Sequence, residues 1–302
     1  MRIGTRASPL ALAQAHHVAS LLGGDVELVE VTTTGDRDRA APDKEKWVKE
    51  LELALLDGRV DACVHSAKDV PTTLPDGLVI AGVPAREDPR DVLCTARGVV
   101  AGTVEELPPG ARVGTSSLRR AALLRAARPD LEIVEIRGNV GTRLALLERG
   151  DLAAIVLAAA GLRRLGHDLD AVGTPLPART FVPAAGQGSL ALECRADDTT
   201  TRAALDALSD RDAHDTLAAE REAVRTLGAD CHSAVGARAV RGDEDRLELH
   251  GWVGAPDGSA VVTDALQAGP GELPVDLGRR LGERLLAAGA RALLDQTPEV
   301  LS

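Results

Sequence analysis

The chain has 302 residues and a formal net charge of −11, with 35 lysines and arginines against 46 aspartates and glutamates. This length allows two or three domains, and the acidic balance argues against a general nucleic-acid partner, because affinity for a phosphate backbone comes from an excess of cations. The only aromatic residues are Trp47, Phe181 and Trp252, too few for a platform that stacks single-stranded bases.

Export and membrane signals are missing from the sequence pattern. Met1 leads into a strand-like segment without the charged and apolar regions of a secretory signal, and no apolar run approaches about 18 residues. The four cysteines have neither metal-ligand nor disulfide spacing: Cys63, Cys94, Cys194 and Cys231. We therefore expect a cytoplasmic protein with reduced thiols that binds no metal and no membrane.

The first two hundred residues alternate short β-branched runs with amphipathic helical stretches, which is typical of βαβ units and a mainly parallel sheet. Ser8 and Pro9 mark the first helix as its N-cap and its first helical residue. The pattern then predicts a strand over 26–34, a helix over 47–56, a buried strand over 62–66, and strands over 79–83 and 92–95.

A second α/β set begins near residue 90. It is predicted as strand 112–114, helix 117–127, strand 133–136, helix 142–149 and strand 154–157, and a further strand is expected over 189–194. From about residue 210 the pattern changes to one long helix ending at Leu227, three strand-like segments near 234–240, 247–253 and 260–266, and a closing helix. This last part indicates a separate small α+β domain.

A basic window in this acidic chain is the strongest chemical signal. Residues 110–165 hold ten arginines and five acidic residues, so the window carries +5 and the remainder −16. Two frames within it, 114–120 (GTSSLRR) and 137–143 (RGNVGTR), should lie where a strand leads into a helix, and helix starts favour anions. The window predicts a site for a small polyanion, although each frame alone also fits a capped helix with solvated arginines.

Two further segments carry candidate reactive groups. Lys68 and Asp69 should emerge at the carboxyl edge of the sheet after strand 62–66, as a salt-bridged turn or as a carboxylate held against a developing cation. Cys231 lies in a loop between a helix and a strand, which favours an accessible thiol, although a lone cysteine is more often inert.

These motifs, in this order, closely resemble the porphobilinogen deaminase family, also called hydroxymethylbilane synthases. The resemblance covers most of the chain, and its motifs are residues 4–11 with Gln14, 48–52, 64–71, 86–91, the two arginine frames, 160–166 and 186–188. It implies two α/β domains arranged like a bilobal periplasmic binding protein, followed by a small C-terminal α+β domain. The expected division is 1–86 plus about 187–208, then 87–186, then 209–302.

The resemblance also implies the chemistry. Cys231 would hold a dipyrromethane cofactor through a thioether, and four porphobilinogen units would be added to this primer with release of ammonia, before hydrolysis frees hydroxymethylbilane. Asp69 would be the catalytic residue, stabilising the azafulvenium cation that loss of ammonia creates. The family suggests a monomer. Two alternatives stay open: a polycarboxylate-binding protein without chemistry, and an inactivated family member.

The remaining site residues follow from the same resemblance. The expected cofactor-binding residues are Lys68, Ser8, Thr115, Ser116, Arg119, Arg120, Arg137 and Gly138. The expected substrate-binding residues are Arg6, Gln14, Arg143, Arg164 and Trp47. The chain departs from the family pattern in its short loop at 35–46, in Trp47, where phenylalanine is usual, and in Ala234, where proline is common.

Overall fold

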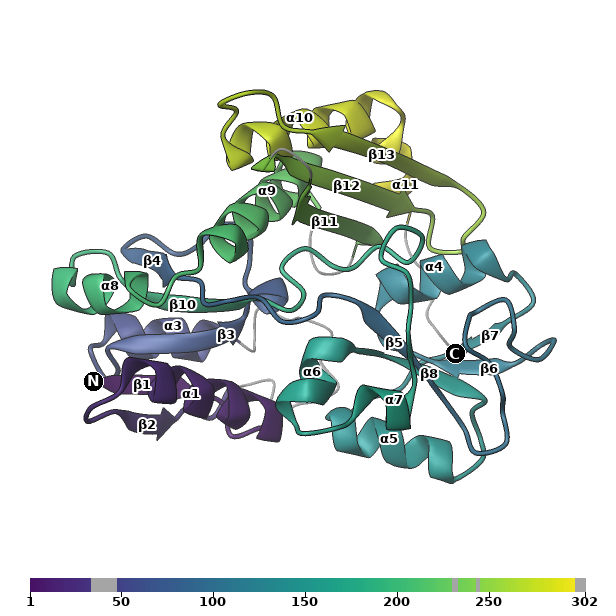
Figure 1. Ribbon diagram of the computed structural model, residues 1–302, viewed down its shortest axis with the longest axis horizontal. Coiled ribbons are helices and arrows are strands. Elements are labelled where there is room, and N and C mark those ends of the chain that lie inside the picture. Colours follow the sequence, from purple (N-terminus) through teal and green to yellow (C-terminus); the bar gives the residue numbers. More distant parts are fainter. Residues whose placement is uncertain (34–47, 230–232, 243–244, 297–302) are drawn as a thin grey trace.

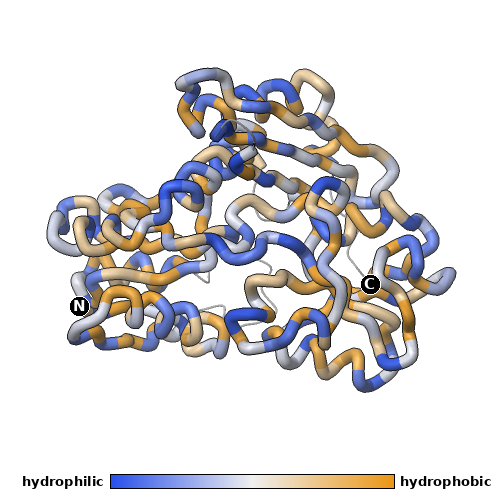
Figure 2. The backbone as a smooth tube through the Cα atoms, in the orientation of Figure 1, coloured by the Kyte–Doolittle hydropathy of each residue, from blue (hydrophilic) through white to orange (hydrophobic). Residues whose placement is uncertain are grey.

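The computed structural model describes residues 1–33, 48–229, 233–242 and 245–296. These residues form three β-sheets, each covered by helices. Figure 1 shows two α/β units side by side, with the third sheet above them. Hydrophobic residues recur along the strands of both large sheets, where they form the cores (Figure 2).

The first unit is built on a sheet with the strand order β2-β1-β3-β10-β4. Its strands are β1 (Arg2–Thr5), β2 (Glu27–Glu30), β3 (Ala62–Ser66), β4 (Leu78–Gly82) and β10 (Leu190–Arg195). Its helices are α1 (Pro9–Leu22), α3 (Lys49–Leu56) and α8 (Thr199–Asp206), and the 3-10 turn η2 (Ala67–Asp69) follows β3 directly. The Ser8 side chain caps α1, as its position before Pro9 predicts.

The second unit is built on a sheet with the strand order β7-β6-β8-β5-β9. Its strands are β5 (Asp91–Thr95), β6 (Arg112–Gly114), β7 (Glu132–Val134), β8 (Ala154–Ala158) and β9 (Thr174–Pro175). Its helices are α4 (Leu118–Ala127), α5 (Val140–Glu148), α6 (Ala159–Arg164) and α7 (Leu169–Val172). Ser117 and Asn139 cap α4 and α5, so both arginine frames do lead into helix starts.

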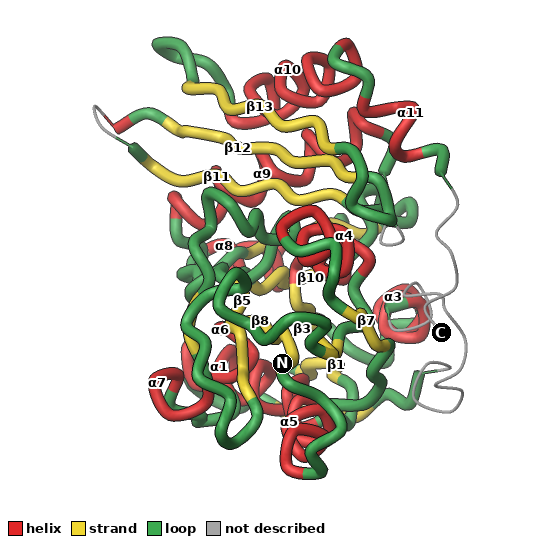
Figure 3. The backbone as a smooth tube through the Cα atoms, turned by 90° about the vertical axis from the view of Figure 1, so that its right-hand side faces the viewer, coloured by secondary structure: helices red, strands yellow, loops and turns green. Residues whose placement is uncertain are grey.

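The third unit follows as an antiparallel sheet in the order β11 (Val235–Arg241), β12 (Leu247–Gly254) and β13 (Val261–Gln267). Helices α9 (Arg211–Leu227), α10 (Pro274–Ala287) and α11 (Ala290–Leu294) cover one face of it. Figures 1 and 3 show α9 running from the first unit to this sheet. No helix in the described part of the chain is long and apolar enough to cross a membrane.

Each large sheet contains one strand that opposes its neighbours. Strand β10 is antiparallel to β3 and β4, and β5 is antiparallel to β8 and β9, whereas the other pairings are parallel. The prediction of a mainly parallel sheet is therefore wrong for half of the pairings. The physical reason is that β5 and β10 are entered from the other unit, through segments 83–90 and 176–189, and not through a helical crossover within one sheet.

The two crossing segments pass each other closely. Gly186 and Gly188 have φ angles of 72° and 92°, and a Cβ atom on Gly188 would collide with the backbone carbonyl of Glu87. Glycine is needed at both positions because other residues rarely adopt this conformation. Gly186 and Gly188 therefore allow the two crossing segments, which form the hinge between the two units, to pack closely together.

A buried ion pair ties the third unit to this hinge. Glu220 of α9 is fully buried and accepts hydrogen bonds from Arg86 Nη1 and Nη2 at 2.7 and 3.0 Å, from Gly186 N at 2.7 Å and from Ala239 N at 2.7 Å. Such a carboxylate is tolerated only with a full set of partners, because burial removes its hydration. The fold is thus a two-lobed α/β structure with a small C-terminal α+β unit, as expected. The domain boundaries stay a prediction.

Candidate active site

Arg119 and Arg120 point into the protein and not into solvent. Their side chains are 4% and 7% exposed and converge on Asp91 of β5, which is fully buried. Arg120 donates to Asp91 Oδ1 from Nε at 2.9 Å and from Nη2 at 2.7 Å, and Arg119 Nη2 lies 2.8 Å from Oδ2. Burial alone would raise the pKa of Asp91, but the two arginines lower it to about 2. This geometry excludes solvated arginines for the first frame.

Gln187 connects this cluster to the turn that carries Asp69. Its side-chain nitrogen donates to Asp91 Oδ1 at 3.0 Å, and its side-chain oxygen accepts from Lys68 Nζ at 3.3 Å. Gln187 is 1% exposed, so these contacts are shielded from water. The sequence drew attention to the glycines around Gln187 but gave this residue no role.

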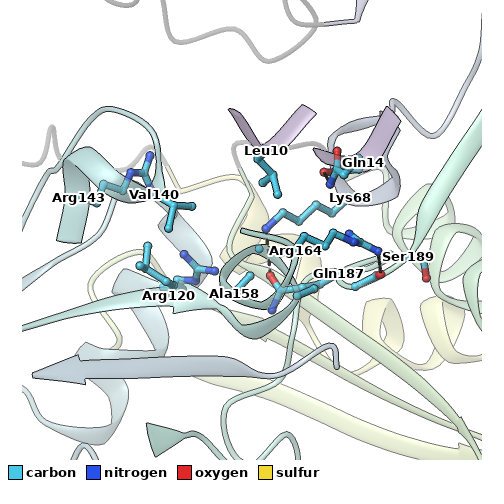
Figure 4. A pocket seen from close by; sticks show the side chains of 16 residues that line it. Leu10, Gln14, Lys68, Arg120, Val140, Arg143, Ala158, Arg164, Gln187 and Ser189 are labelled. Carbon is cyan, nitrogen blue, oxygen red and sulfur yellow. Dashed lines mark hydrogen bonds between the residues drawn. The ribbon is translucent and has the colours of Figure 1, made fainter. Parts of the chain in front are cut away.

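A cavity of about 110 Å³ lies between the first two units. Figure 4 shows charged side chains from four elements around it: Lys68 of η2, Arg120 of α4, Arg143 of α5 and Arg164 of α6. Gln14 of α1 also lines it and donates to Ser66 Oγ at 2.8 Å. The structure therefore brings together residues that the sequence assigned to cofactor and substrate binding.

Arg143 and Arg164 have no carboxylate at ion-pair distance within the described residues. Arg143 donates to Gly138 O at 2.9 Å and to Ser116 Oγ at 3.1 Å, and Arg164 donates to Gly188 O at 2.7 Å. Burial, reinforced by Arg120, lowers the pKa of Arg143 to about 10, and burial also lowers the pKa of Arg164. Half-buried guanidinium groups whose hydrogen bonds go only to neutral oxygens are suited to receive an anion.

A larger cavity, of about 340 Å³, adjoins the first and shares Lys68 with it. Asp69 from the first unit, Arg119 from the second and Ala229 and Ser233 from the third all line it. Its volume is in the range of small-molecule sites, roughly 300 to 1,000 Å³. Ala229 and Ser233 flank Cys231, which, like Trp47, lies outside the described residues.

Arg221 of α9 holds the segment that follows Asp69. Its guanidinium donates to the carbonyl oxygens of Val70 at 3.0 Å, Pro71 at 2.6 Å and Thr72 at 3.3 Å. The third unit therefore helps to fix the turn that carries Asp69. No pattern in the sequence predicts this role, because Arg221 lies in a long amphipathic helix whose periodicity already accounts for it.

The other described residues that were predicted to bind cofactor or substrate line neither cavity: Arg6, Ser8, Thr115, Ser116, Arg137 and Gly138. Ser116 and Gly138 support the cavity indirectly, since both accept hydrogen bonds from Arg143. Arg137 pairs with Glu135 at 2.9 Å, and its side chain is 52% exposed. Direct ligand contacts by this group stay a prediction.

The described cysteines are unsuited to covalent chemistry. Burial raises the pKa of Cys94 to about 12 and that of Cys194 to about 11, and it raises the pKa of Cys63 well above its usual range. Because the thiolate is the nucleophile, these three thiols are unreactive near neutral pH. This leaves Cys231 as the candidate. Within the described residues, no cluster of histidine, cysteine, aspartate and glutamate is placed to hold a metal ion.

The chain is similar to known proteins in sequence over nearly its whole length. Residues 1–203 match the family model "Porphobilinogen deaminase, dipyromethane cofactor binding domain", and residues 215–287 match "Porphobilinogen deaminase, C-terminal domain". Two solved structures are similar at low identity. A nutrient-binding protein from Burkholderia cenocepacia bound to methionine has a TM-score of 0.43 and 16% identity over 68% of this chain and 89% of that one. A methionine-binding protein has a TM-score of 0.42 and 19% identity over 69% and 89%.

Two curated relatives match nearly the full length. Porphobilinogen deaminase of Brevibacillus brevis is 43% identical over 303 residues, which cover 97% of this chain and 96% of that protein. Porphobilinogen deaminase of Deinococcus deserti is 44% identical over 315 residues, which cover 98% of each. The chain therefore belongs to the porphobilinogen deaminase family of transferases, whose N-terminal region binds a dipyrromethane cofactor.

Proposed function

We propose that this protein joins four porphobilinogen units head to tail on a dipyrromethane primer linked to Cys231, releases one ammonia for each unit, and then hydrolyses the product to hydroxymethylbilane. One observation carries the proposal. Asp69, Arg119 and the two residues that flank Cys231 in the described chain line a single cavity to which all three units contribute.

The residues of the larger cavity fit a dipyrromethane group. Lys68, Arg119 and Arg221 supply cations for its carboxylates, while Val224 and Val235 supply apolar surface for the pyrrole rings. When bound, this group provides the nucleophilic carbon to which the first substrate is joined. The protein would hold its rings rigidly, because Arg221 fixes the Asp69 turn and Arg119 is fixed by Asp91.

The charged wall of the smaller cavity would bind the carboxylates of the incoming substrate. Porphobilinogen carries an acetate and a propionate, and Arg143 and Arg164 are the two half-buried cations there without a carboxylate at ion-pair distance among the described residues. Two carboxylates placed against these cations would orient the aminomethyl carbon of the substrate for reaction. Lys68, which lines both cavities, would lie between substrate and primer.

Asp69 would act on the charge that the reaction creates. Breaking the carbon–nitrogen bond of the substrate would release ammonia and leave a cationic pyrrole, whose charge the Asp69 carboxylate would stabilise until the new carbon–carbon bond to the primer has formed and a proton has left. At roughly 4 Å and an effective dielectric near 20, a carboxylate stabilises such a cation by about 4 kcal/mol. This corresponds to about a thousandfold in rate.

The test uses the holoenzyme and two readouts, intact mass and ammonia release. We expect a mass increment of one dipyrromethane that is absent in Cys231→Ser. Asp69→Asn should keep the increment and substrate binding but lose most turnover, whereas Asp76→Asn, at an exposed site on the same loop, should behave as wild type. Lack of the increment after exposure to porphobilinogen would refute the proposal. Reversible carboxylate binding without ammonia release would instead favour a binding protein.

A further inference from the structure

A second basic cluster lies on the face of the third sheet that is turned away from its helices. Arg238 of β11 and His250 of β12 are register partners, so their side chains stand next to each other on one face. Their strand neighbours Ala239 and Leu249 belong to the core under the helices, so Arg238 and His250 point the other way. Helices α9, α10 and α11 lie on the other face of the sheet (Figure 1), while Trp252, on the same face as His250, packs into the core of the second unit.

Arg179 joins the cluster from the crossing segment 176–189. This segment runs along β11, since Ala237 N donates to Pro183 O at 3.0 Å. Arg179 is exposed, and its charge acts on both Arg238 and His250. Three basic side chains from separate elements thus gather at one point of a chain whose net charge is −11.

Among the described residues, no carboxylate lies at ion-pair distance from Arg238. It is partly buried, and within the described residues its Nε is sealed from solvent without a hydrogen-bond partner. Burial, then the neighbouring arginines, lowers its pKa. Two carboxylates that act on Arg238 electrostatically are paired with other residues: Glu220 with Arg86, and Asp88 with Arg90 at 2.7 Å.

His250 has one ring nitrogen available. Its Nε2 lies 2.9 Å from Thr263 Oγ1, and that hydroxyl donates to Gly251 O at 2.9 Å, so Nε2 carries the hydrogen and Nδ1 is open. Burial, then Arg238 and Arg179, lowers the pKa of His250, while Asp264 of β13 raises it. Glu248 is the next acidic residue on the same face of β12.

We propose that Arg179, Arg238 and His250 form a binding site for a small doubly charged oxyanion of the phosphate type, separate from both cavities. Two guanidinium groups offer donors in a geometry that matches anion oxygens, and Nδ1 of a protonated His250 adds a third. A dianion fits better than a single carboxylate because two permanent positive charges and one titratable group face it.

The experiment follows the imidazole resonance of His250 by NMR in the holoenzyme, in which the dipyrromethane cofactor would fill the larger cavity. His250→Gln assigns the resonance. Inorganic phosphate is titrated at constant ionic strength, with acetate as the monovalent comparison. We expect phosphate to shift the resonance saturably and to raise the pKa of His250 by about half a unit or more. Arg238→Gln should weaken the apparent affinity at least tenfold.

Controls separate this site from general screening and from misfolding. Arg279→Gln, an arginine of α10 paired with Asp276 at 2.8 Å, should leave phosphate binding unchanged. Arg179→Gln, at an exposed position, should weaken binding even if Arg238→Gln proves poorly folded. A wild-type resonance that does not respond to phosphate, or responds equally to acetate, overturns the proposal. A response to sulfate matching that to phosphate would support oxyanion recognition.

Discussion

Replacing Asp91 by asparagine is expected to destabilise the protein strongly. The substitution keeps the size of the side chain but leaves the buried guanidinium groups of Arg119 and Arg120 without a counterion. Breaking a buried ion pair from one side costs about 3–5 kcal/mol. A second figure comes from the pKa of Asp91, which falls from 3.8 for an ordinary aspartate to about 2. This fall means that the folded protein stabilises the ionised carboxylate over the protonated carboxyl group by roughly 2.4 kcal/mol. We therefore expect a loss of about 3 kcal/mol at neutral pH.

The pH dependence of this effect has a defined sign. Because the pKa of Asp91 is lower in the folded protein than in the unfolded chain, its charge contributes fully above about pH 4 and less as the pH falls toward 2. The difference in unfolding free energy between wild type and Asp91→Asn should thus be constant from about pH 8 to 5 and shrink below about pH 4.

Urea denaturation followed by circular dichroism, at several pH values, measures both effects. The matched control is Asp130→Asn, which removes an equally short ion pair, 2.6 Å from Arg128, at a position open to solvent. Water screens that pair, so its loss should leave the midpoint nearly unchanged. If Asp91→Asn unfolded at the same urea concentration as Asp130→Asn, Asp91 would not be the counterion that the geometry implies.

Three further predictions test the hinge, the polar link and the thiols. Glu220→Gln should lower the unfolding free energy by about 3 kcal/mol in urea, whereas Asp212→Asn, at a side chain that is 60% exposed on the same helix, should change it little; equal losses would remove the hinge role. Gln187→Leu should raise the KM of ammonia release roughly tenfold, because Lys68 loses its link to Asp91; unchanged kinetics would contradict this. Alkylation of the native cofactor-free protein at pH 8, mapped by peptide mass, should leave Cys63, Cys94 and Cys194 unmodified because they are buried. Modification of any of these three thiols would contradict their burial.

The local features of the fold could be predicted because neighbouring residues encode them. Strands β3 and β6 begin and end where their hydrophobic patterns predict, and Ser8 and Ser117 cap the helices that follow them. The arginine frames were found for the same reason, since glycine, serine and arginine stand together in each. Alternation and capping act over a few residues, so a single sequence is sufficient to reveal them.

The partners of those arginines could not be predicted from the same information. Asp91 lies 29 residues before Arg120 and outside the window whose charge was counted. Gln187 and Arg221 reach the site from still further along the chain, through the hinge and through α9. The direction of β5 and β10 depends likewise on which unit the chain has just left. Each is a consequence of tertiary packing, on which local propensity has no bearing.

The two arginine frames differ in how their charge is compensated, and this difference bears on how a lengthening product can be held. Asp91 partly neutralises Arg119 and Arg120 and so weakens their attraction for each added carboxylate. The growing pyrrole product can therefore move past these two arginines. Arg143 and Arg164 donate only to neutral oxygens among the described residues, and Asp69 and Glu87 act on them only at longer range, so their charge is compensated less. If the proposed function holds, Arg143 and Arg164 bind the two carboxylates of the incoming substrate strongly. Arg119 and Arg120 bind the growing pyrrole product more weakly, so that it can advance and finally leave.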